Sequence, residues 1–241
     1  MIDNTIIAQS NPKSPISEAY RVLRTNIQFS SLDEPIKTMI VTSAMPGEGK
    51  STTITNMAVV FAQMGSKVLL VDCDLRKPKI HKLFNVSNKT GITNVLAEHG
   101  NLDKYIIKTE IENLNLLASG TIPPNPSELL GSNSMKDILG MLKERYDLVF
   151  IDTPPVGTVT DAQILSTIVD GTIIVAASGQ VKIDALQRAK MLLEKVNANI
   201  LGVIMNKLDR TANSYYYYYY YSNYYSEDEE DKEKKKKRNK K

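Results

Sequence analysis

The sequence contains a single cysteine, Cys73, no tryptophan and only two histidines, His81 and His99. One cysteine excludes an internal disulfide framework and is typical of a protein that works in a reducing compartment. Cys73 is most simply a packed strand residue. The two histidines lie in no recognisable motif, and we assign neither of them a catalytic role.

Long apolar runs and a large net charge are also missing. No run approaches the length of about 20 residues that a membrane-spanning helix needs, and the N-terminal segment MIDNTIIAQSNPKSP is too polar for a signal peptide. The 30 Lys and Arg residues nearly balance the 27 Asp and Glu residues, unlike in a basic nucleic-acid binder. We therefore expect a cytoplasmic protein that binds no nucleic acid and reaches a membrane only through a partner.

Apolar residues make up 42% of the chain, which is enough for a sizeable core. Short β-branched runs, typical of buried parallel strands, alternate with helical patterns such as the apolar spacing of Leu186, Ala189 and Leu193. The runs are residues 39–41, 68–71, 148–151, 172–175 and 200–205. The alternation predicts an α/β fold, with a mostly parallel sheet flanked by helices.

The composition changes sharply near residue 213. A run of seven tyrosines is followed by two more, then by an acidic block and a basic block. This segment has no apolar periodicity, so we expect one domain over residues 1–212 and a disordered tail over residues 213–241. The clustered tyrosines are candidate phosphoacceptors: Tyr215, Tyr216, Tyr217, Tyr218, Tyr219, Tyr220, Tyr221, Tyr224 and Tyr225. The alternative is a low-complexity tail that self-associates.

The segment from Ala44 to Ser51 follows a predicted strand and opens a predicted helix, which is the context of a phosphate-binding P-loop. In such a loop, backbone N–H groups and the helix N-terminus bind phosphate oxygens, and glycines allow close approach. Lys50 is expected to reach the β- and γ-phosphates of ATP, and the Ser51 hydroxyl to bind Mg²⁺. The predicted nucleotide-binding residues of this loop are Gly47, Glu48, Gly49, Lys50, Ser51 and Thr52.

Carboxylates follow two other predicted strands, where they are expected to lie beside the P-loop. Asp152 fits the role of the second magnesium-binding residue of P-loop enzymes. Of Asp72 and Asp74, one is expected to assist the metal, with Asp74 as the candidate ligand, and either one to accept a proton from the attacking hydroxyl. Arg76 is expected to stabilise transferring charge or to pair with a carboxylate. Asp74 on its own has the alternative role of a helix cap.

The end of the last predicted strand carries a second nucleotide signal. Residues 206–209 fit the N-K-x-D pattern in which the aspartate of GTPases reads guanine, yet Asp152 is followed by Thr153 and two prolines, whereas GTPases carry D-x-x-G. We favour Asn206 as a contact to the base or ribose of ATP, and guanine recognition stays as the alternative.

Four features in combination resemble the bacterial tyrosine autokinases (BY-kinases) of capsular and exopolysaccharide synthesis: the P-loop, the D-x-D-x-R strand end, the Asp152-x-x-Pro155 loop and the tyrosine cluster. The match runs from about Pro15 into the tail. The resemblance implies an ATP-dependent kinase that phosphorylates its own tail tyrosines in trans and so regulates polysaccharide synthesis and export. It also implies activation by a transmembrane adaptor of the polysaccharide co-polymerase type, which recruits the kinase to the inner face of the membrane, and a cognate phosphotyrosine phosphatase.

The first predicted helix adds to the resemblance. Glu18, Arg21 and Arg24 fit the E-x-x-R-x-x-R element, which resembles a subunit contact in the ring-shaped homo-oligomer of the family. Residues 16, 20, 23 and 27 form an apolar stripe on the same helix, which should face a core or a partner. The alternative is a solvated helix flank.

Two other functions stay open at the level of the sequence. One is a scaffold whose assembly is gated by nucleotide. The other is a switch of the partitioning ATPase or GTPase type, but those ATPases carry a second lysine early in the P-loop, where this chain has Met45. Labelled ATP, Mg²⁺ and the cytoplasmic segment of the adaptor would separate the three possibilities.

Overall fold

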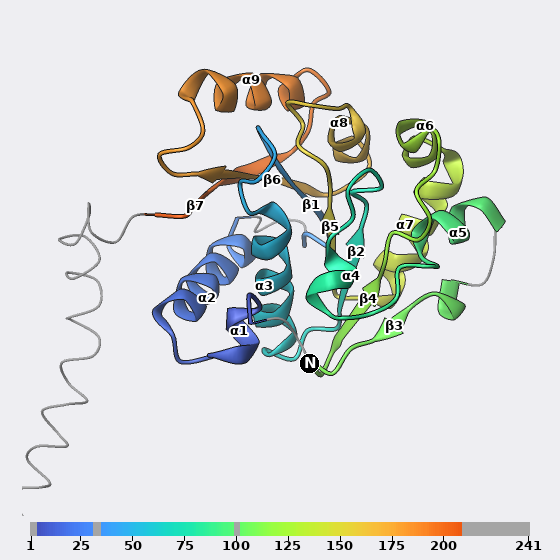
Figure 1. Ribbon diagram of the computed structural model, residues 1–241, viewed down its shortest axis with the longest axis horizontal. Coiled ribbons are helices and arrows are strands. Elements are labelled where there is room, and N and C mark those ends of the chain that lie inside the picture. Colours follow the sequence, from blue (N-terminus) through green and yellow to red (C-terminus); the bar gives the residue numbers. More distant parts are fainter. Residues whose placement is uncertain (1–3, 31–34, 99–101, 209–241) are drawn as a thin grey trace, which may run out of the picture. The chain divides into compact units, whose positions relative to one another are not determined.

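The computed structural model describes residues 4–30, 35–98 and 102–208. The predicted boundary after residue 212, the tail tyrosines, His99 and Asp209 all lie outside the described residues. Within these residues the chain forms a seven-stranded sheet with helices on both faces (Figure 1). No described helix is both long and apolar enough to span a bilayer.

The sheet has the strand order β3-β4-β2-β5-β1-β6-β7, and all neighbours are parallel except β3 and β4. The strands are β1 (Thr38–Ser43), β2 (Val68–Asp72), β3 (Ile107–Lys108), β4 (Leu114–Leu117), β5 (Leu148–Asp152), β6 (Gly171–Ala177) and β7 (Ile200–Asn206). This confirms the predicted α/β fold and all five predicted strands. Strands β3 and β4 were not predicted, because β3 has only two residues and β4 is a four-residue run without β-branched residues.

Nine α-helices and one short 3₁₀ segment precede or connect the strands within the described residues. They are α1 (Ile7–Ser10), α2 (Pro15–Gln28), α3 (Lys50–Ala62), α4 (Ile80–Leu83), α5 (Ile92–Glu98), η1 (Leu102–Lys104), α6 (Pro126–Leu130), α7 (Asn133–Arg145), α8 (Asp161–Ser166) and α9 (Ile183–Glu194). Helix α6 begins at Pro126, in the first turn, where proline is favoured. The Asn125 side chain donates to the Glu128 carboxylate at 3.0 Å and makes no capping bond to the backbone.

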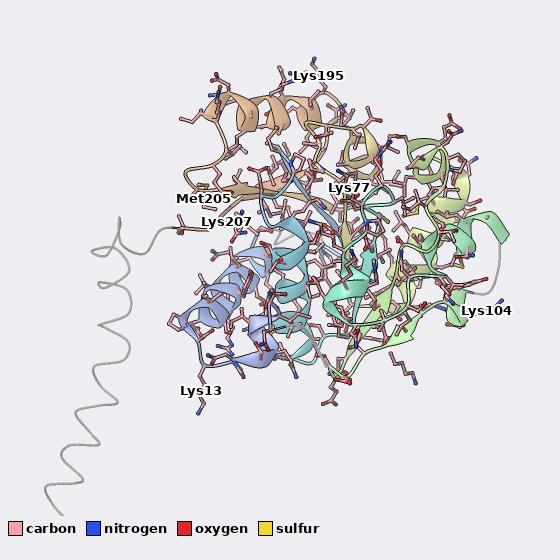
Figure 2. The ribbon with its side chains drawn as sticks, in the orientation of Figure 1. Lys13, Lys77, Lys104, Lys195, Met205 and Lys207 are labelled. Atoms are coloured by element: carbon pink, nitrogen blue, oxygen red, sulfur yellow. The ribbon has the colours of Figure 1, made fainter. Side chains whose placement is uncertain are left out.

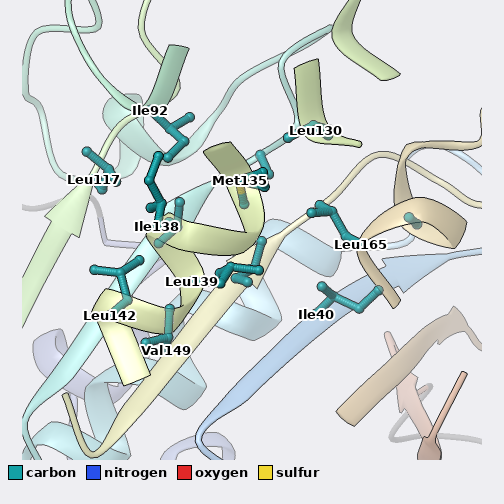
Figure 3. Close-up of a cluster of buried hydrophobic side chains, with 14 of the residues drawn as sticks. Ile40, Ile92, Leu117, Leu130, Met135, Ile138, Leu139, Leu142, Val149 and Leu165 are labelled. Atoms are coloured by element: carbon teal, nitrogen blue, oxygen red, sulfur yellow. The ribbon is translucent and has the colours of Figure 1, made fainter. Parts of the chain in front are cut away.

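The core forms two layers because successive strand residues point to opposite faces of the sheet. On one face, Ile40, Val149 and Ile174 pack against helices α5 to α9 (Figure 3). On the other face, Met39, Phe150 and their neighbours pack against α1, α2, α3 and α4. Helix α3 is buried along nearly its whole length, so its first turn is held firmly against the sheet.

The apolar stripe of α2 faces this second layer. Tyr20, Leu23 and Ile27 pack against the core around α3, whereas Ile16 is 42% exposed. The stripe therefore covers the core of its own chain over most of its length. Ser14 caps the helix, because its side chain accepts a hydrogen bond from the backbone N–H of Ser17.

Asp170, directly before β6, ties the start of β1 to the end of α7 at the amino ends of the strands. Its carboxylate accepts hydrogen bonds from the Thr38 N–H at 2.8 Å, the Thr38 hydroxyl at 3.0 Å and the Lys37 N–H at 3.0 Å. The Lys143 ammonium, at the end of α7, lies 2.6 Å from it. Burial alone would raise the pKa of Asp170, but the bonds from Lys143 and Thr38 outweigh it and lower that pKa below its ordinary value.

We expect Asp170→Asn to lower the free energy of unfolding by about 1–3 kcal/mol, because a charged acceptor of several bonds is lost. Since the folded pKa is lowered, the charged carboxylate stabilises the protein above its unfolded pKa of about 3.9, and this contribution disappears as the pH falls through the folded pKa. Urea unfolding between pH 3 and pH 7 measures both effects. The wild type should lose more stability toward pH 3 than the variant does.

Asp137→Asn, at an exposed position on α7, makes the same change of charge and should leave stability within about 0.5 kcal/mol of the wild type. Parallel pH curves for the wild type and Asp170→Asn would contradict this role of Asp170.

Candidate active site

The P-loop joins β1 to α3 at the carboxyl edge of the sheet. Gly47 and Gly49 have φ angles of 85° and 90°, in the left-handed region that favours glycine. A Cβ atom on Gly49 would lie 2.1 Å from Nδ2 of Asn206. Gly49 therefore has both a backbone and a steric reason to be glycine.

Glu48 braces the P-loop from within the chain. Its carboxylate accepts hydrogen bonds from the backbone N–H of Met45 at 2.8 Å and of Ala177 at 3.3 Å, and the residue is only 4% exposed. Its carbonyl oxygen accepts a bond from Nδ2 of Asn206 at 2.9 Å. The Glu48 side chain thus holds the loop against the end of β6, and Asn206 ties the loop to the end of β7.

The loop after Asp152 is fastened to the same region. The Thr42 hydroxyl donates to the carbonyl oxygen of Pro154 at 2.8 Å, and the N–H of Val156 donates to the carbonyl oxygen of Ser43 at 2.9 Å. A Cβ atom on Gly157 would lie 2.3 Å from the carbonyl oxygen of Ala44. These contacts fix the β5 loop directly against the start of the P-loop.

Lys50, Ser51, Asp74 and Asp152 converge at the start of α3. The Lys50 ammonium lies 2.9 Å from Asp74 Oδ2 and 3.4 Å from Asp152 Oδ1, and the Ser51 hydroxyl donates to Asp152 Oδ2 at 2.5 Å. None of these four residues is more than 8% exposed. Three of the residues predicted to act on the phosphates and the metal therefore meet around the predicted P-loop lysine.

Asp72 takes a different position from Asp74. Strands β2 and β5 pair Asp72 with Asp152, but the carboxylate of Asp72 accepts hydrogen bonds from the backbone N–H groups of Lys79 at 3.1 Å and Ile80 at 3.0 Å. It also accepts one from the N–H of Asp74 at 3.2 Å. Asp72, which is fully buried, thus fixes the turn between β2 and α4.

Burial and neighbouring charges shift several pKa values in this cluster. Burial, together with the nearby charge of Asp152, raises the pKa of Asp72 to about 8. Burial also raises the pKa of Asp152, although Lys50 and Ser51 oppose the shift. Burial would lower the pKa of Lys50, but Asp152 and Asp74 outweigh it and raise that pKa, so the ammonium stays charged. Burial raises the pKa of the Cys73 thiol, which is packed in the core as predicted but lies directly after β2 and not in a strand.

The donor set fits a magnesium ion that binds together with a nucleotide. The Ser51 hydroxyl and the carboxylates of Asp152 and Asp74 are oxygen ligands, and a cationic group of the chain, Lys50 Nζ, already lies among them. Among the described residues, no group of three or more His, Cys, Asp or Glu side chains could hold a metal ion by itself. Mg²⁺ usually needs only one or two protein carboxylates when phosphates complete its shell.

Arg76 pairs with a carboxylate at the start of α8. Its Nε lies 2.9 Å from Asp161 Oδ2, and one of its terminal nitrogens lies 3.0 Å from Asp161 Oδ1 and 2.9 Å from the Ser127 hydroxyl. Sequence reasoning missed Asp161 and Ser127, which lie 85 and 51 residues further along the chain. The one signal for Asp161 is an aspartate at the first position of a helix.

The three residues predicted at a subunit interface lie on α2, apart from this cluster. Arg21 donates to the Glu18 carboxylate at 2.7 Å and to the carbonyl oxygen of Pro12 at 2.6 Å. Arg24 donates to the carbonyl oxygen of Val60 on α3 at 3.1 Å. Part of the E-x-x-R-x-x-R element therefore fastens α2 to its own chain.

Comparison with known proteins places these features in a family. The model of the AAA domain family matches residues 36–208. The tyrosine-protein kinase YwqD of Bacillus subtilis is 46% identical over 205 residues, covering 85% of this chain and 86% of that protein. The tyrosine-protein kinase CpsD of Streptococcus pneumoniae is 41% identical over 199 residues, covering 82% of this chain and 87% of that protein.

Solved structures show the same relationship. The chimerical protein CapA2B2 superposes with a TM-score of 0.82 at 43% identity and covers 86% of this chain and 91% of its own. The septum site-determining protein MinD of Pyrococcus horikoshii, complexed with Mg-ADP, superposes with a TM-score of 0.62 at 27% identity, over 72% of this chain and 71% of its own. The P-loop fold is therefore shared with the septum-placement ATPases, whereas the higher identities are to tyrosine kinases.

We expect Gly49→Ala to weaken the binding of Mg·ADP by about 10-fold or more. The new methyl group would displace the Asn206 amide, break its bond to Glu48 and strain a left-handed residue. Fluorescence titration with a labelled ADP measures the affinity.

Gly65→Ala is the matched control, because Gly65 also has a left-handed φ of 99°, but nothing lies within 4 Å of its added Cβ. It should lower stability while leaving ADP affinity within about twofold. Equal affinities for the Gly49 variant and the wild type would refute this account of the P-loop.

Proposed function

We propose that this chain, which belongs to the bacterial tyrosine-protein kinases, phosphorylates the tyrosines of its own C-terminal tail, and that its membrane adaptor is a separate chain. The reaction transfers the γ-phosphoryl group of ATP to tyrosines of the set 215–221, 224 and 225 on a neighbouring copy. This modification regulates the synthesis and export of capsular or extracellular polysaccharide.

One observation carries the proposed chemistry: the Lys50 ammonium lies between Asp74 and Asp152 at the mouth of the P-loop. Two buried carboxylates hold this lysine in place, and the phosphates of ATP are the stronger and better matched anions for it. Lys50 therefore moves toward the β- and γ-phosphates when ATP binds. The backbone N–H groups of residues 47–52 and the N-terminus of α3 bind the remaining phosphate oxygens.

Mg²⁺ would be held by the Ser51 hydroxyl and Asp152, with Asp74 close by, and when bound it neutralises charge on the β- and γ-phosphates. The bond between Ser51 and Asp152 already orients both groups. When Lys50 moves to the phosphates, the Asp74 and Asp152 carboxylates lose the cation that now lies beside them. A magnesium ion that takes its place is therefore electrostatically favoured. The Mg-ADP complex of the MinD relative supports the same pairing of nucleotide and metal.

Asp74 is the better candidate to accept the tyrosine proton. A tyrosine hydroxyl has a pKa of about 10, so a base must take its proton during or after attack. Both oxygens of Asp72 accept backbone hydrogen bonds and the residue is fully buried, whereas Asp74 is 5% exposed and bonds Lys50, the group that is to meet the γ-phosphate. Asp72 then shapes the turn that carries Asp74.

The tail suits a substrate that is delivered from another copy. An extended segment from residue 213 to residue 225 spans roughly 40 Å, at about 3.3 Å per residue. Each phosphate adds about −1.5 to −2 charge, so a phosphorylated tail is repelled by the nucleotide and by the acidic site. Phosphorylation would therefore weaken a ring that is assembled through the tails.

The proposed partners follow from the same premise. A transmembrane adaptor of the polysaccharide co-polymerase type would activate the kinase and hold it at the inner face of the membrane. Copies of the chain would meet through α2, where Val22 is 53% exposed beside Glu18 and Arg21. A cognate phosphotyrosine phosphatase would reset the tail.

A mixing experiment tests transfer between copies. Lys50→Met with an intact tail is incubated with a second variant in which all nine clustered tyrosines are phenylalanine, together with labelled ATP, Mg²⁺ and the cytoplasmic segment of the adaptor. We expect label on the tail of Lys50→Met, because the second variant supplies the active site. Separation of the two chains by affinity tag, followed by phosphosite mapping, measures it.

Each variant alone should incorporate at least about 100-fold less label than the wild type, since one lacks the phosphate-binding lysine and the other lacks acceptors. If the wild type labels its tail while the mixture stays unlabelled, transfer occurs within one chain. If the wild type binds ATP but labels nothing with the adaptor present, the kinase proposal for the tail fails.

Asp72→Asn and Asp74→Asn separate the two carboxylates. We expect Asp74→Asn to slow single-turnover phosphorylation by about 10²–10⁴-fold, because the proton acceptor is lost. Asp72→Asn replaces an acceptor oxygen with an N–H₂ group that faces backbone donors, so its main effect should be a lower melting temperature. A folded Asp72→Asn protein that does not transfer phosphate, beside an active Asp74→Asn protein, would assign the proton to Asp72.

A further inference from the structure

Arg76 in the loop after β2, Ser127 on α6 and Asp161 at the start of α8 form a cluster of mutual hydrogen bonds next to the site. We propose that Asp161 is a positioning residue for phosphoryl transfer, which holds Arg76 and through it the loop that carries Asp74. This inference rests on the proposed function, because it concerns how Asp74 is placed for that reaction. Figure 2 shows Lys77, the residue after Arg76, on the loop that approaches α8.

Each of the three residues is hydrogen-bonded to the other two. Asp161 receives two parallel N–H bonds from the Arg76 guanidinium, at 2.9 Å and 3.0 Å, and an O–H bond from Ser127 at 2.7 Å. Arg76 also donates to the Ser127 hydroxyl at 2.9 Å. A two-pronged Arg–carboxylate pair fixes orientation as well as distance. The Asp161 side chain is fully buried and the Arg76 side chain is 37% exposed, so Arg76 neutralises a carboxylate that has no access to water.

The cluster closes a circuit of the segments that surround the phosphate site. Asp161 begins α8, which follows the loop after Asp152, and that loop is fastened to the P-loop through Thr42 and Ser43. Lys50 links the P-loop to Asp74, and Arg76 lies two residues beyond Asp74. The Arg76–Asp161 pair is therefore the far side of a ring of contacts that runs from the P-loop to Asp74 and back.

Asp74 depends on this ring for its direction. Its Oδ1 accepts a hydrogen bond from the backbone N–H of Lys77 at 3.0 Å, while its Oδ2 faces Lys50. Arg76 lies between Asp74 and Lys77, so a shift of Arg76 moves the amide that orients the carboxylate. The Arg76 guanidinium is turned toward α8 and occupied by Asp161 and Ser127, which gives it a holding role and leaves the phosphoryl group to Lys50.

The chain offers a matched control pair. Arg145 and Asp103 also form a two-pronged pair, with distances of 2.8 Å and 3.1 Å, but it lies at the end of α7 and both side chains are more than 40% exposed. Asp103→Asn removes the same carboxylate charge from the same type of pair without touching the ring of contacts. It should leave every measurement below within about twofold of the wild type.

The test uses the full chain with the adaptor segment and compares Asp161→Asn, Arg76→Lys, the double variant and Asp103→Asn. We expect Asp161→Asn to lower kcat by about 10–100-fold, as removal of an orienting partner does in metal sites. The KM for ATP should change by less than about threefold, because the P-loop itself is intact. The double variant should be no more than about twofold worse than the more damaged single variant, because one unit is broken in both.

A binding readout separates this inference from the proposed function. The Mg²⁺ concentration that half-saturates the binding of a fluorescent ADP should rise by about 3–10-fold in Asp161→Asn, with metal-free ADP affinity unchanged. This measurement needs no phosphoryl transfer, so it tests the placement of Asp74 even if the wild type does not label its tail. The tail proposal is contradicted if the wild type does not label its tail. The positioning role is contradicted if Asp161→Asn needs the same Mg²⁺ concentration as the wild type to half-saturate ADP binding.

Other outcomes are also decisive. If Arg76→Lys is inactive while Asp161→Asn is fully active, Arg76 acts directly on the phosphoryl group, and the proposal is overturned. If Asp161→Asn does not fold, Ser127→Ala decides, because it removes the two hydrogen bonds of the Ser127 hydroxyl, to Asp161 and from Arg76, and leaves the ion pair. We expect a kcat about 2–5-fold lower and a melting temperature lower by about 2–4 °C, and a kcat equal to that of the wild type overturns the positioning role.

Discussion

The interaction on which the site depends is the buried contact of the Lys50 ammonium with Asp74 and Asp152. A buried charge is costly unless it is paired, and carboxylates crowded together raise one another's pKa. The lysine makes this arrangement stable without nucleotide, and the carboxylates in turn hold the lysine where phosphates arrive. Nucleotide binding is therefore an exchange of anions around one cation.

The sheet makes this exchange possible because it brings three strand ends together. Strands β2 and β5 flank each other in a register that sets Asp72 beside Asp152, and β1 delivers the P-loop next to β5. The surrounding loops are fixed by hydrogen bonds between backbone groups and the side chains of Thr42, Glu48 and Asn206. Preorganised groups of this kind need little rearrangement during phosphoryl transfer, which is how such enzymes stabilise charge.

The sequence was sufficient for the parts that follow from local patterns. Apolar runs located the strands, and the rule that ligands bind at the carboxyl ends of parallel strands grouped Lys50, Ser51, Asp74 and Asp152 correctly. It was not sufficient for contacts that join distant segments. The turn of Asp72 toward the amides of α4 and the pairing of Arg76 with Asp161 depend on loop geometry that no short pattern encodes.

The central claim is tested most directly by a crystal structure of the protein with Mg·ADP and a γ-phosphate mimic. The account predicts that Lys50 Nζ leaves Asp74 for the phosphate oxygens, and that a metal ion lies between the Ser51 hydroxyl and Asp152. A structure in which the nucleotide is bound at the P-loop while Lys50 keeps its contacts with both carboxylates would contradict it.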